Sequence, residues 1–374
     1  MRVIMTGGGT GGHVNPALAI ANTIAENEPG SEILFVGTEH GIENKLTAAA
    51  GYPIRHVKIA GFKRSLSLKN IKAAYLAFVS PMKAKKIVRD FKPDIVIGTG
   101  GYVCWPVLVA ASKMGIPTAV HESNAFPGVA VRKLQPYVDA IWLNFAESEK
   151  YLTAKDKILR VGNPLRGAFG TVERDEARKK LGIEGKYEHF VLSFGGSLGA
   201  EKVNEACLAF MRDYVKKHPE VYHLHACGSI ELEEATKMYR EYGLEDCENA
   251  KLVEYIYDMP VQMEAADVII SRAGAMTVSE LAMRKKASVM IPSPNVTDNH
   301  QYKNAKALYD RGATVLIEEK ELSDGVLEGA VASLLSDSEK RKEMGEAVYS
   351  FSCADANKVI YEEVKKLVAS RRVK

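Results

Sequence analysis

Two glycine-rich segments have the composition of phosphate-binding loops. They read GGGTGGH at residues 7–13 and FGGSLGA at residues 194–200, and each separates a short apolar run from a segment with helical periodicity. Glycines let the backbone approach an anion closely, and the amides at the start of a following helix, with about half a positive charge from its dipole, bind it. The sequence therefore predicts one phosphate-binding loop in each half of the chain.

A dinucleotide site is an alternative, because Gly7, Gly9 and Gly12 also fit the G-x-G-x-x-G pattern. An adenosine-binding loop usually has an acidic residue about 20 residues further on, and Glu39 lies somewhat beyond that point. An NAD-dependent oxidoreductase would also use only the first loop. Either loop alone fits a tight turn between strand and helix, whereas two loops at equivalent places favour nucleotide binding.

The segment SRAGAMTVSELA, residues 271–282, predicts another anion site in the second half. We expect its helix to begin near Ala275 or Met276, so that the first turn presents free amides to a phosphate. Glu280 lies about one turn further, and a carboxylate there can accept both hydroxyls of a ribose. An exposed helical glutamate is the plainer interpretation, but its place beside a phosphate-type helix start favours ribose.

Other polar side chains follow predicted strand ends, where loops of α/β proteins carry function. They are Tyr102, His121 and Asn124 in the first half and Asn299, His300 and Gln301 in the second. His13 and His121 have the residue type that titrates near neutrality. A histidine in an α/β core is more often a structural residue with satisfied hydrogen bonds. A structural role and a role in the site therefore both stay open for His13 and His121.

The elements that would position these residues alternate between strand and helix. Strands are predicted at 2–6, 32–36, 94–98, 118–121, 140–144, 159–161, 190–194, 222–226, 251–254, 268–271, 288–291 and 314–317. This alternation predicts two doubly wound parallel sheets, with the joint near VGNPL at 161–165 and the ligand between the domains, at the carboxyl ends of the strands.

Composition bounds the class of protein. With 374 residues, the chain exceeds what one core usually sustains, so two domains are expected. No apolar run approaches the about 18 residues of a spanning helix, and the sequence enters a strand without a leader, so we expect a cytoplasmic protein. The five cysteines form no C-x-x-C pair, which argues against disulfides and structural zinc.

Positive charge is concentrated in the first half. Residues 1–163 hold 20 Lys and Arg against 12 Asp and Glu. From Arg55 to Lys92 there are eleven basic residues and one acid, among apolar residues at helical spacing, with Ser80 and Pro81 expected to cap a second short helix. The segment fits a solvated basic face, or a surface for anionic lipid at roughly 1 kcal/mol per basic residue. Nucleic acid is not expected, because no binding module accompanies it.

Seven motifs together form a resemblance that covers almost the whole chain. They are GGGTGGH, GTGGY, HESN, VGNPLR, FGGSLGA, SRAGAMTVSE and DNHQYKNA, in this order. In them the chain resembles the family of bacterial undecaprenyldiphospho-muramoylpentapeptide β-N-acetylglucosaminyltransferases. The resemblance implies the GT-B fold, in which two Rossmann-like domains face each other across a cleft.

It also implies an inverting hexosyltransferase. Such an enzyme moves N-acetylglucosamine from UDP-N-acetylglucosamine to the 4-hydroxyl of the muramoyl sugar of lipid I, giving lipid II and UDP. This reaction serves peptidoglycan synthesis, and with it cell-wall biogenesis, cell shape and cell division. Members lie peripherally on the cytoplasmic face of the cell membrane, which favours the lipid interpretation of residues 55–92.

Residue roles follow by matching the motifs. His13 is the candidate base, with binding of the acceptor diphosphate as its alternative role. Substrate-binding positions are Thr10, Gly11, Gly12, Tyr102, Asn124, Arg166, Ser197, Ile256, Ala275, Met276, Thr277, Val278, Ser279, Glu280 and Gln301. Some members have glutamine where this chain has His300, so the resemblance assigns no sugar contact to this position.

The resemblance divides the chain into an acceptor and membrane domain, 1–163 with 351–374 returning to it, and a donor domain, 164–350. No Asp-x-Asp motif occurs, so neither a metal nor another cofactor is expected. The alternatives are a UDP-N-acetylglucosamine 2-epimerase, a diacylglycerol glycosyltransferase and a nucleotide-sugar binding module without turnover.

Overall fold

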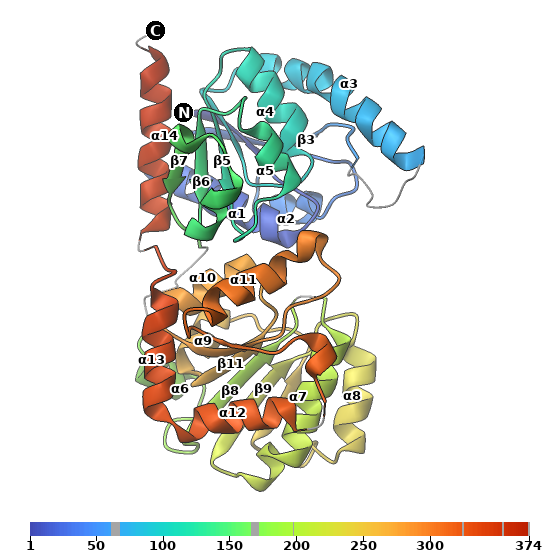
Figure 1. The fold of residues 1–374 in the computed structure, drawn as a ribbon, viewed down its shortest axis with the longest axis vertical. Coiled ribbons are helices and arrows are strands. Elements are labelled where there is room, and N and C mark those ends of the chain that lie inside the picture. Colours follow the sequence, from blue (N-terminus) through green and yellow to red (C-terminus); the bar gives the residue numbers. More distant parts are fainter. Residues whose placement is uncertain (61–67, 166–171, 197, 324, 354, 373–374) are drawn as a thin grey trace. The chain divides into compact units, whose positions relative to one another are not determined.

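The chain forms two compact units. The computed structural model describes residues 1–60, 68–165, 172–196, 198–323, 325–353 and 355–372. One unit comprises Met1–Arg166 with Cys353–Lys374, and the other Gly167–Ser352. We call them the amino-side unit and the carboxyl-side unit; the sequence had placed their boundaries at 163 and 350. Each has a parallel sheet with helices on both faces (Figure 1).

The amino-side unit has a seven-stranded parallel sheet of order β3-β2-β1-β4-β5-β6-β7. Its strands are β1 Arg2–Thr6, β2 Glu32–Gly37, β3 Ile54–His56, β4 Ile95–Gly98, β5 Thr118–Glu122, β6 Ala140–Leu143 and β7 Ile158–Arg160. Its helices are α1 Gly11–Asn27, α2 Glu43–Ala49, α3 Leu68–Phe91, α4 Cys104–Lys113, α5 Val129–Leu134 and α14 Ala356–Arg372, with 3-10 helices η1 Ala146–Tyr151 and η2 Lys155–Lys157. Central β1 is buried on both faces, with Ile4 in one core cluster and Val3 in the other, which explains its continuous apolar run.

Helix α14 belongs to this unit although it ends the chain. Its buried residues Ile360, Val364 and Val368 recur every four positions and join the core cluster that contains Leu18 of α1. Such spacing places them on one face of the helix. The chain therefore returns from the carboxyl-side unit to complete the amino-side core.

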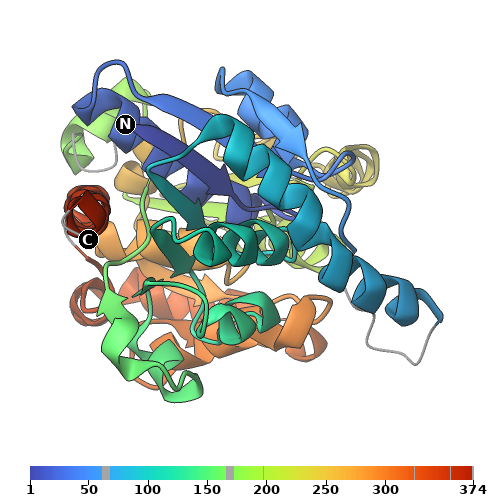
Figure 2. The same ribbon diagram turned by 90° about the horizontal axis from the view of Figure 1, so that it is seen from above.

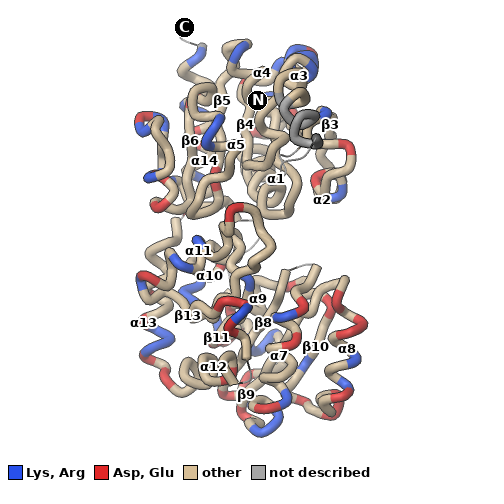
Figure 3. Tube along the Cα trace, turned by 45° about the vertical axis from the view of Figure 1, so that its right-hand side comes forward, with Lys and Arg blue, Asp and Glu red and all other residues tan. Residues whose placement is uncertain are grey.

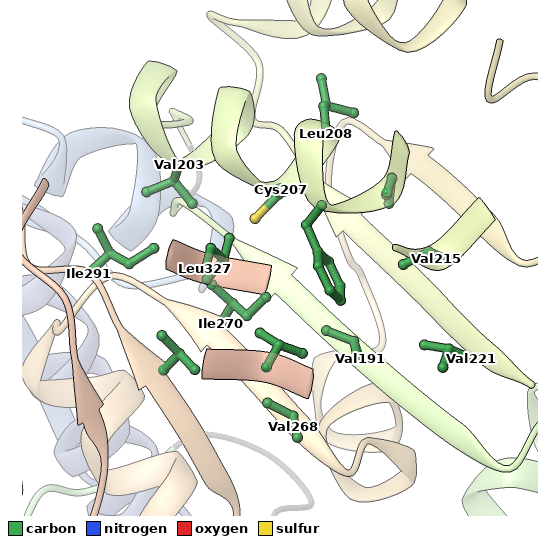
Figure 4. Packing of buried hydrophobic residues seen from close by; sticks show 14 of the residues in the cluster. Val191, Val203, Cys207, Leu208, Val215, Val221, Val268, Ile270, Ile291 and Leu327 are labelled. Carbon is green, nitrogen blue, oxygen red and sulfur yellow. The ribbon is translucent and has the colours of Figure 1, made fainter. Parts of the chain in front are cut away.

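The carboxyl-side unit has a six-stranded parallel sheet of order β10-β9-β8-β11-β12-β13. Its strands are β8 His189–Phe194, β9 Val221–Ala226, β10 Ala250–Val253, β11 Val268–Ser271, β12 Ala287–Met290 and β13 Val315–Leu316. Its helices are α6 Arg174–Lys180, α7 Glu201–Asp213, α8 Leu232–Glu241, α9 Met259–Ala265, α10 Ala275–Met283, α11 His300–Tyr309, α12 Val326–Ser336 and α13 Ser338–Tyr349, with 3-10 helices η3 Val215–Lys217, η4 Thr297–Asn299 and η5 Glu319–Glu321. Val203 and Cys207 of α7 pack in one cluster with Val191 of β8 and Ile270 of β11 (Figure 4).

Both sheets reverse their strand order at the same place. The first strand of each unit, β1 or β8, has its sequence successor on one side and the fourth strand, β4 or β11, on the other. Ligands of doubly wound folds bind at the carboxyl ends of strands at this switch point. The glycine-rich segments follow β1 and β8, so each lies at the switch point of its own unit.

One element was missed from the sequence, and one prediction about a helix was wrong. The edge strand β3 was not predicted, because it has three residues, two of them exposed. The helix expected to end at Ser80 instead runs through Pro81 as one helix, α3. Proline costs roughly 3 kcal/mol inside a helix, and the burial of Ser80, Ala84 and Val88 on one face offsets that cost. Helix α3 extends past the other elements of its unit (Figure 2).

Candidate active site

The first glycine loop connects β1 to α1 at the switch point of the amino-side unit. Gly9 has φ +85°, a left-handed conformation that favours glycine. Thr10 is extended and its side chain forms no capping hydrogen bond, so α1 begins at Gly11 without a side-chain acceptor at its amides. Thr10 and Gly12 are exposed. The loop thus exposes backbone and a hydroxyl, the groups that the predicted phosphate site requires.

His13 lies in the first turn of α1 and is half-buried. Its Nδ1 is 3.0 Å from the carbonyl oxygen of Gly8. Because a carbonyl only accepts hydrogen bonds, Nδ1 carries the hydrogen in the neutral ring, and Nε2 keeps its lone pair. Burial lowers the pKa of His13, although a hydrogen bond to Gly8 and the charge of Glu43 oppose it. The imidazole is therefore neutral at pH 7 and has a basic nitrogen.

The turn after β4 packs against the ring of His13. Gly100 has φ +107°, and a Cβ added there would lie 2.6 Å from Cδ2 of His13. Only glycine fits both the conformation and the space. Tyr102 follows in the same turn with 39% of its surface exposed, and its ring is near Gly9. Tyr102 and His13 thus line the same loop.

The loop after β5 is fixed by a buried carboxylate. Glu122 accepts hydrogen bonds from the backbone and side-chain nitrogens of Asn124, at 2.9 and 3.0 Å, and from the backbone of Gly128 at 2.7 Å. The half-buried Asn124 is therefore held in a defined position. His121 is different, because it is fully buried and bonds the carbonyl of Gly162 at 2.8 Å. Burial lowers its pKa to about 4, so His121 has the structural role of a core histidine.

A pocket of about 560 Å³ lies at the carboxyl ends of β8, β11 and β12 within the carboxyl-side unit. It is lined by the second glycine loop, by Arg272, Gly274 and Thr277, and by Ser293, Asn295, Gln301 and Glu319. Gly196 and Gly199 have φ +99° and +93°, and Gly199 packs against the end of β9. The residues that line this pocket include two of the predicted binding residues, Thr277 and Gln301.

The polar groups of the pocket are held by neighbours. Oε1 of Gln301 accepts a hydrogen bond of 2.9 Å from the backbone nitrogen of Ser293. Arg272 forms an ion pair of 2.5 Å with Glu319 and donates to the carbonyl of Ile291 at 3.2 Å. A guanidinium fixed in this way is oriented before a ligand arrives.

Helix α10 begins at Ala275, as predicted. Ala275, Val278 and Ser279 are buried, and the hydroxyl of Ser279 bonds the carbonyl of Ala275 at 3.1 Å. Glu280 is half-buried, and burial raises its pKa to about 7. A carboxyl held this way ionises near neutral pH and gains a partner when a hydroxyl donates to it.

The remaining residues singled out in the sequence fall into three groups. Met276 is half-buried and Ile256 is 5% exposed in the carboxyl-side unit. Arg166 and Ser197 lie outside the described residues. His300 begins α11, directly after Asp298 and Asn299 in left-handed conformations, and its Nδ1 bonds the carbonyl of Thr297 at 2.8 Å. This bond fixes the ring at the edge of the loop.

Sequence reasoning missed the carboxylates that organise the site. Glu43 and Glu319 have no spacing that marks them, since they contact Gly9 and Arg272, which are distant in the sequence. Glu122 lies inside the HESN motif, but its hydrogen bonds to its own loop were not predicted. Within the described residues, no group of three or more His, Cys, Asp or Glu is arranged to hold a metal ion, and no helix there is long and apolar enough to cross a membrane.

Comparison with known proteins decides the family. Residues 3–143 match the glycosyltransferase family 28 N-terminal domain, and residues 190–360 match the family 28 C-terminal domain. The UDP-N-acetylglucosamine--N-acetylmuramyl-(pentapeptide) pyrophosphoryl-undecaprenol N-acetylglucosamine transferase of Acetivibrio thermocellus is 44% identical over 374 residues, 99% of each chain. The chain belongs to this transferase family. The relative of the same name from Alkaliphilus oremlandii is 42% identical and covers 98% of this chain and 99% of its own.

Solved structures agree with this transferase family. The crystal structure of Acinetobacter baumannii MurG has a TM-score of 0.78 at 27% identity, over 98% of this chain and 99% of that chain. UDP-GlcNAc 2-epimerase from Neisseria meningitidis has a TM-score of 0.67 at 16% identity, over 98% and 100%, and shows the shared fold alone. The predicted family, fold class and glycosyltransferase activity are confirmed, and the transferase is favoured over the epimerase.

Proposed function

We propose that this protein transfers N-acetylglucosamine from UDP-N-acetylglucosamine to the 4-hydroxyl of the muramoyl sugar of lipid I, with inversion, to give lipid II and UDP. The observation that carries the proposal is identity of 44% over the whole length with a transferase of that name. The proposal places the protein in peptidoglycan synthesis.

The carboxyl-side pocket is the proposed donor site. The diphosphate meets the second glycine loop and the amino-terminal turn of α10, near Ala275 and Thr277, where the helix dipole favours an anion. Glu280 accepts the ribose hydroxyls, Gln301 contacts the sugar, and the backbone of Ile256 contacts uracil. Resemblance adds Arg166 and Ser197 to the donor contacts.

His13 is the proposed base. The muramoyl hydroxyl gives its proton to Nε2 while its oxygen attacks the anomeric carbon from the face opposite UDP, and the bond to UDP breaks. Preorganised amides stabilise the charge that grows on the leaving diphosphate. In the amino-side unit, Tyr102 and Asn124 contact the sugars, and the amides of Gly11 and Gly12 with the Thr10 hydroxyl contact diphosphate.

Helix α3 is the proposed membrane contact. Tyr75, Phe78 and Met82 are 64%, 79% and 61% exposed, and the exposed Lys85 and Arg89 continue the same helical face. Figure 3 shows basic residues along α3. A face with apolar side chains at one end and cations at the other suits the interface of an anionic lipid bilayer. We place it on the cytoplasmic face of the cell membrane, as a peripheral contact.

The proposal is tested with labelled UDP-N-acetylglucosamine and vesicles that contain either a lipid I analogue or diacylglycerol. Label is expected in lipid I, in a β linkage, with release of UDP. Label in diacylglycerol alone would indicate the related lipid glycosyltransferase. Epimerised donor without transfer would indicate the epimerase, and unreacted donor would indicate a binding module.

A further inference from the structure

A buried carboxylate lies behind the first glycine loop and has no part in the mechanism above. Glu43, the first residue of α2, is 1% exposed. Its Oε1 accepts hydrogen bonds from the backbone nitrogen and the hydroxyl of Thr38, at 2.8 and 2.7 Å. Its Oε2 accepts one from the backbone nitrogen of Gly9, at 3.2 Å. Glu43 thus ties the loop after β2 to the loop after β1.

The bond from Gly9 connects Glu43 to the proposed base. The nitrogen of Gly9 and the carbonyl of Gly8 belong to one peptide group. That carbonyl accepts the hydrogen of Nδ1 of His13 at 3.0 Å. The carboxylate and the imidazole therefore bind opposite ends of a single peptide dipole, and each bond strengthens the other by polarisation.

The surrounding sequence leaves room for this carboxylate. A Cβ added at Gly8 would lie 2.8 Å from the carboxyl carbon of Glu43, and one added at Gly37 would lie 2.6 Å from its Cγ. A Cβ at Gly41 would overlap the carboxyl group. Three glycines from three places in the chain thus enclose one side chain, which explains why these positions lack a Cβ.

We propose that Glu43 is a positioning residue for His13, acting through the Gly8–Gly9 peptide group. It holds that peptide so that the carbonyl fixes the Nδ1–H tautomer and leaves Nε2 as the base. Its negative charge also stabilises the imidazolium that forms when Nε2 takes the acceptor proton. In a catalytic triad a carboxylate bonds the catalytic histidine directly and orients it. Here Glu43 would do the same through a peptide group. The inference rests on the proposed function of His13 as the base.

The charges agree with this arrangement. Burial acts to raise the pKa of Glu43, but the hydrogen bonds from Thr38 and Gly9 outweigh it and leave that pKa below its ordinary value. Glu43 is therefore ionised at pH 7. Among the described residues, it is Glu43 whose charge acts to raise the pKa of His13 against the effect of burial.

The test compares Glu43→Gln with the parent enzyme and with Thr38→Val. The glutamine keeps the size of the side chain and removes the charge. We expect kcat to fall roughly ten- to a hundred-fold, the KM for UDP-N-acetylglucosamine to stay unchanged, and the acidic midpoint of the pH–rate profile to move to lower pH. Thr38→Val loses one bond to Glu43 but keeps its charge and the Gly9 bond, so its midpoint should equal that of the parent.

A double variant separates positioning from loop stability. In a His13→Ala background, Glu43→Gln should lower the residual rate no further, because the two residues act as one unit. A further loss there, or an unmoved pH midpoint in the single variant, would overturn the proposal. If His13→Ala itself kept the parental rate, the base role would fail, which is a distinct outcome.

If Glu43→Gln does not fold, the proposal can still be tested on the parent enzyme. Its imidazole ¹⁵N shifts report which nitrogen of His13 carries the hydrogen. We expect Nδ1–H in the neutral ring. Nε2–H as the main form would contradict the proposal, whatever the outcome of the transfer assay.

Discussion

The buried histidines of β9 predict how the carboxyl-side unit loses stability in acid. Ser193 of β8 lies 2.6 Å from Nε2 of His223 and 2.7 Å from Nδ1 of His225. Nε2 of His225 donates to Oδ1 of Asn204 at 3.1 Å, so its Nδ1 accepts from Ser193, and Ser193 in turn accepts from His223. Both rings are neutral in this chain of hydrogen bonds, and Ser193, which links them, directly precedes the second glycine loop.

The magnitude follows from the burial of His225. Burial lowers its pKa to about 4, and it also lowers that of His223 well below the ordinary value. The unfolded chain binds a proton near pH 6.5 that the folded chain does not bind until about pH 4, so stability decreases as pH falls through this window. For His225 alone, the free energy of unfolding falls by about 2 kcal/mol between pH 7 and pH 5. This corresponds to a roughly thirty-fold larger equilibrium constant for opening of the unit.

The assay is hydrogen exchange of peptides that cover β8 and β9, corrected for intrinsic rates at pH 7 and pH 5. His225→Gln keeps an amide that can bond Ser193 and Asn204 but removes the titration. We expect the acid-induced loss in opening free energy to be about 2 kcal/mol smaller in this variant than in the parent. His218→Gln, outside the buried network, serves as the control and should behave as the parent. An equal pH effect in His225→Gln and the parent would refute the reasoning.

Three further predictions concern the sites. Gly100→Ala places a Cβ 2.6 Å from the ring of His13, so the transfer rate should fall more than about tenfold while the donor Kd from calorimetry stays constant. Because the pKa of Glu280 is about 7 and the carboxylate is the form that accepts ribose hydroxyls, donor affinity should rise up to about tenfold from pH 6 to pH 8; in Glu280→Gln this pH dependence should vanish. Phe78→Ser should weaken sedimentation with anionic vesicles about tenfold, whereas Tyr309→Ser, exposed on the other unit, should leave it unchanged.

Elements with strong local signals were predictable from the sequence. β1 and β8 are continuous apolar runs followed by glycine-rich turns, and α10 begins at the predicted Ala275. The edge strand β3 was missed because three residues with two exposed carry no apolar pattern. The break expected at Pro81 was wrong because tertiary burial of one face of α3 outweighs a local preference.

The site was predictable only where residue type and position after a strand coincide, as in the glycine loops and His13. The carboxylates that fix these groups were not, because their roles arise from tertiary partners. Glu43 bonds Gly9 across two elements, and Glu319 meets Arg272 from a distant 3-10 helix. His121 was an equal candidate to His13 by type, but burial in the sheet assigns it a structural role.

The most direct test of the account is the single-turnover rate of transfer to a lipid I analogue by His13→Ala, measured beside the donor Kd of the same variant. A base that takes the acceptor proton predicts a rate roughly a hundred-fold or more below that of the parent enzyme, with an unchanged Kd. A rate close to that of the parent would contradict the account.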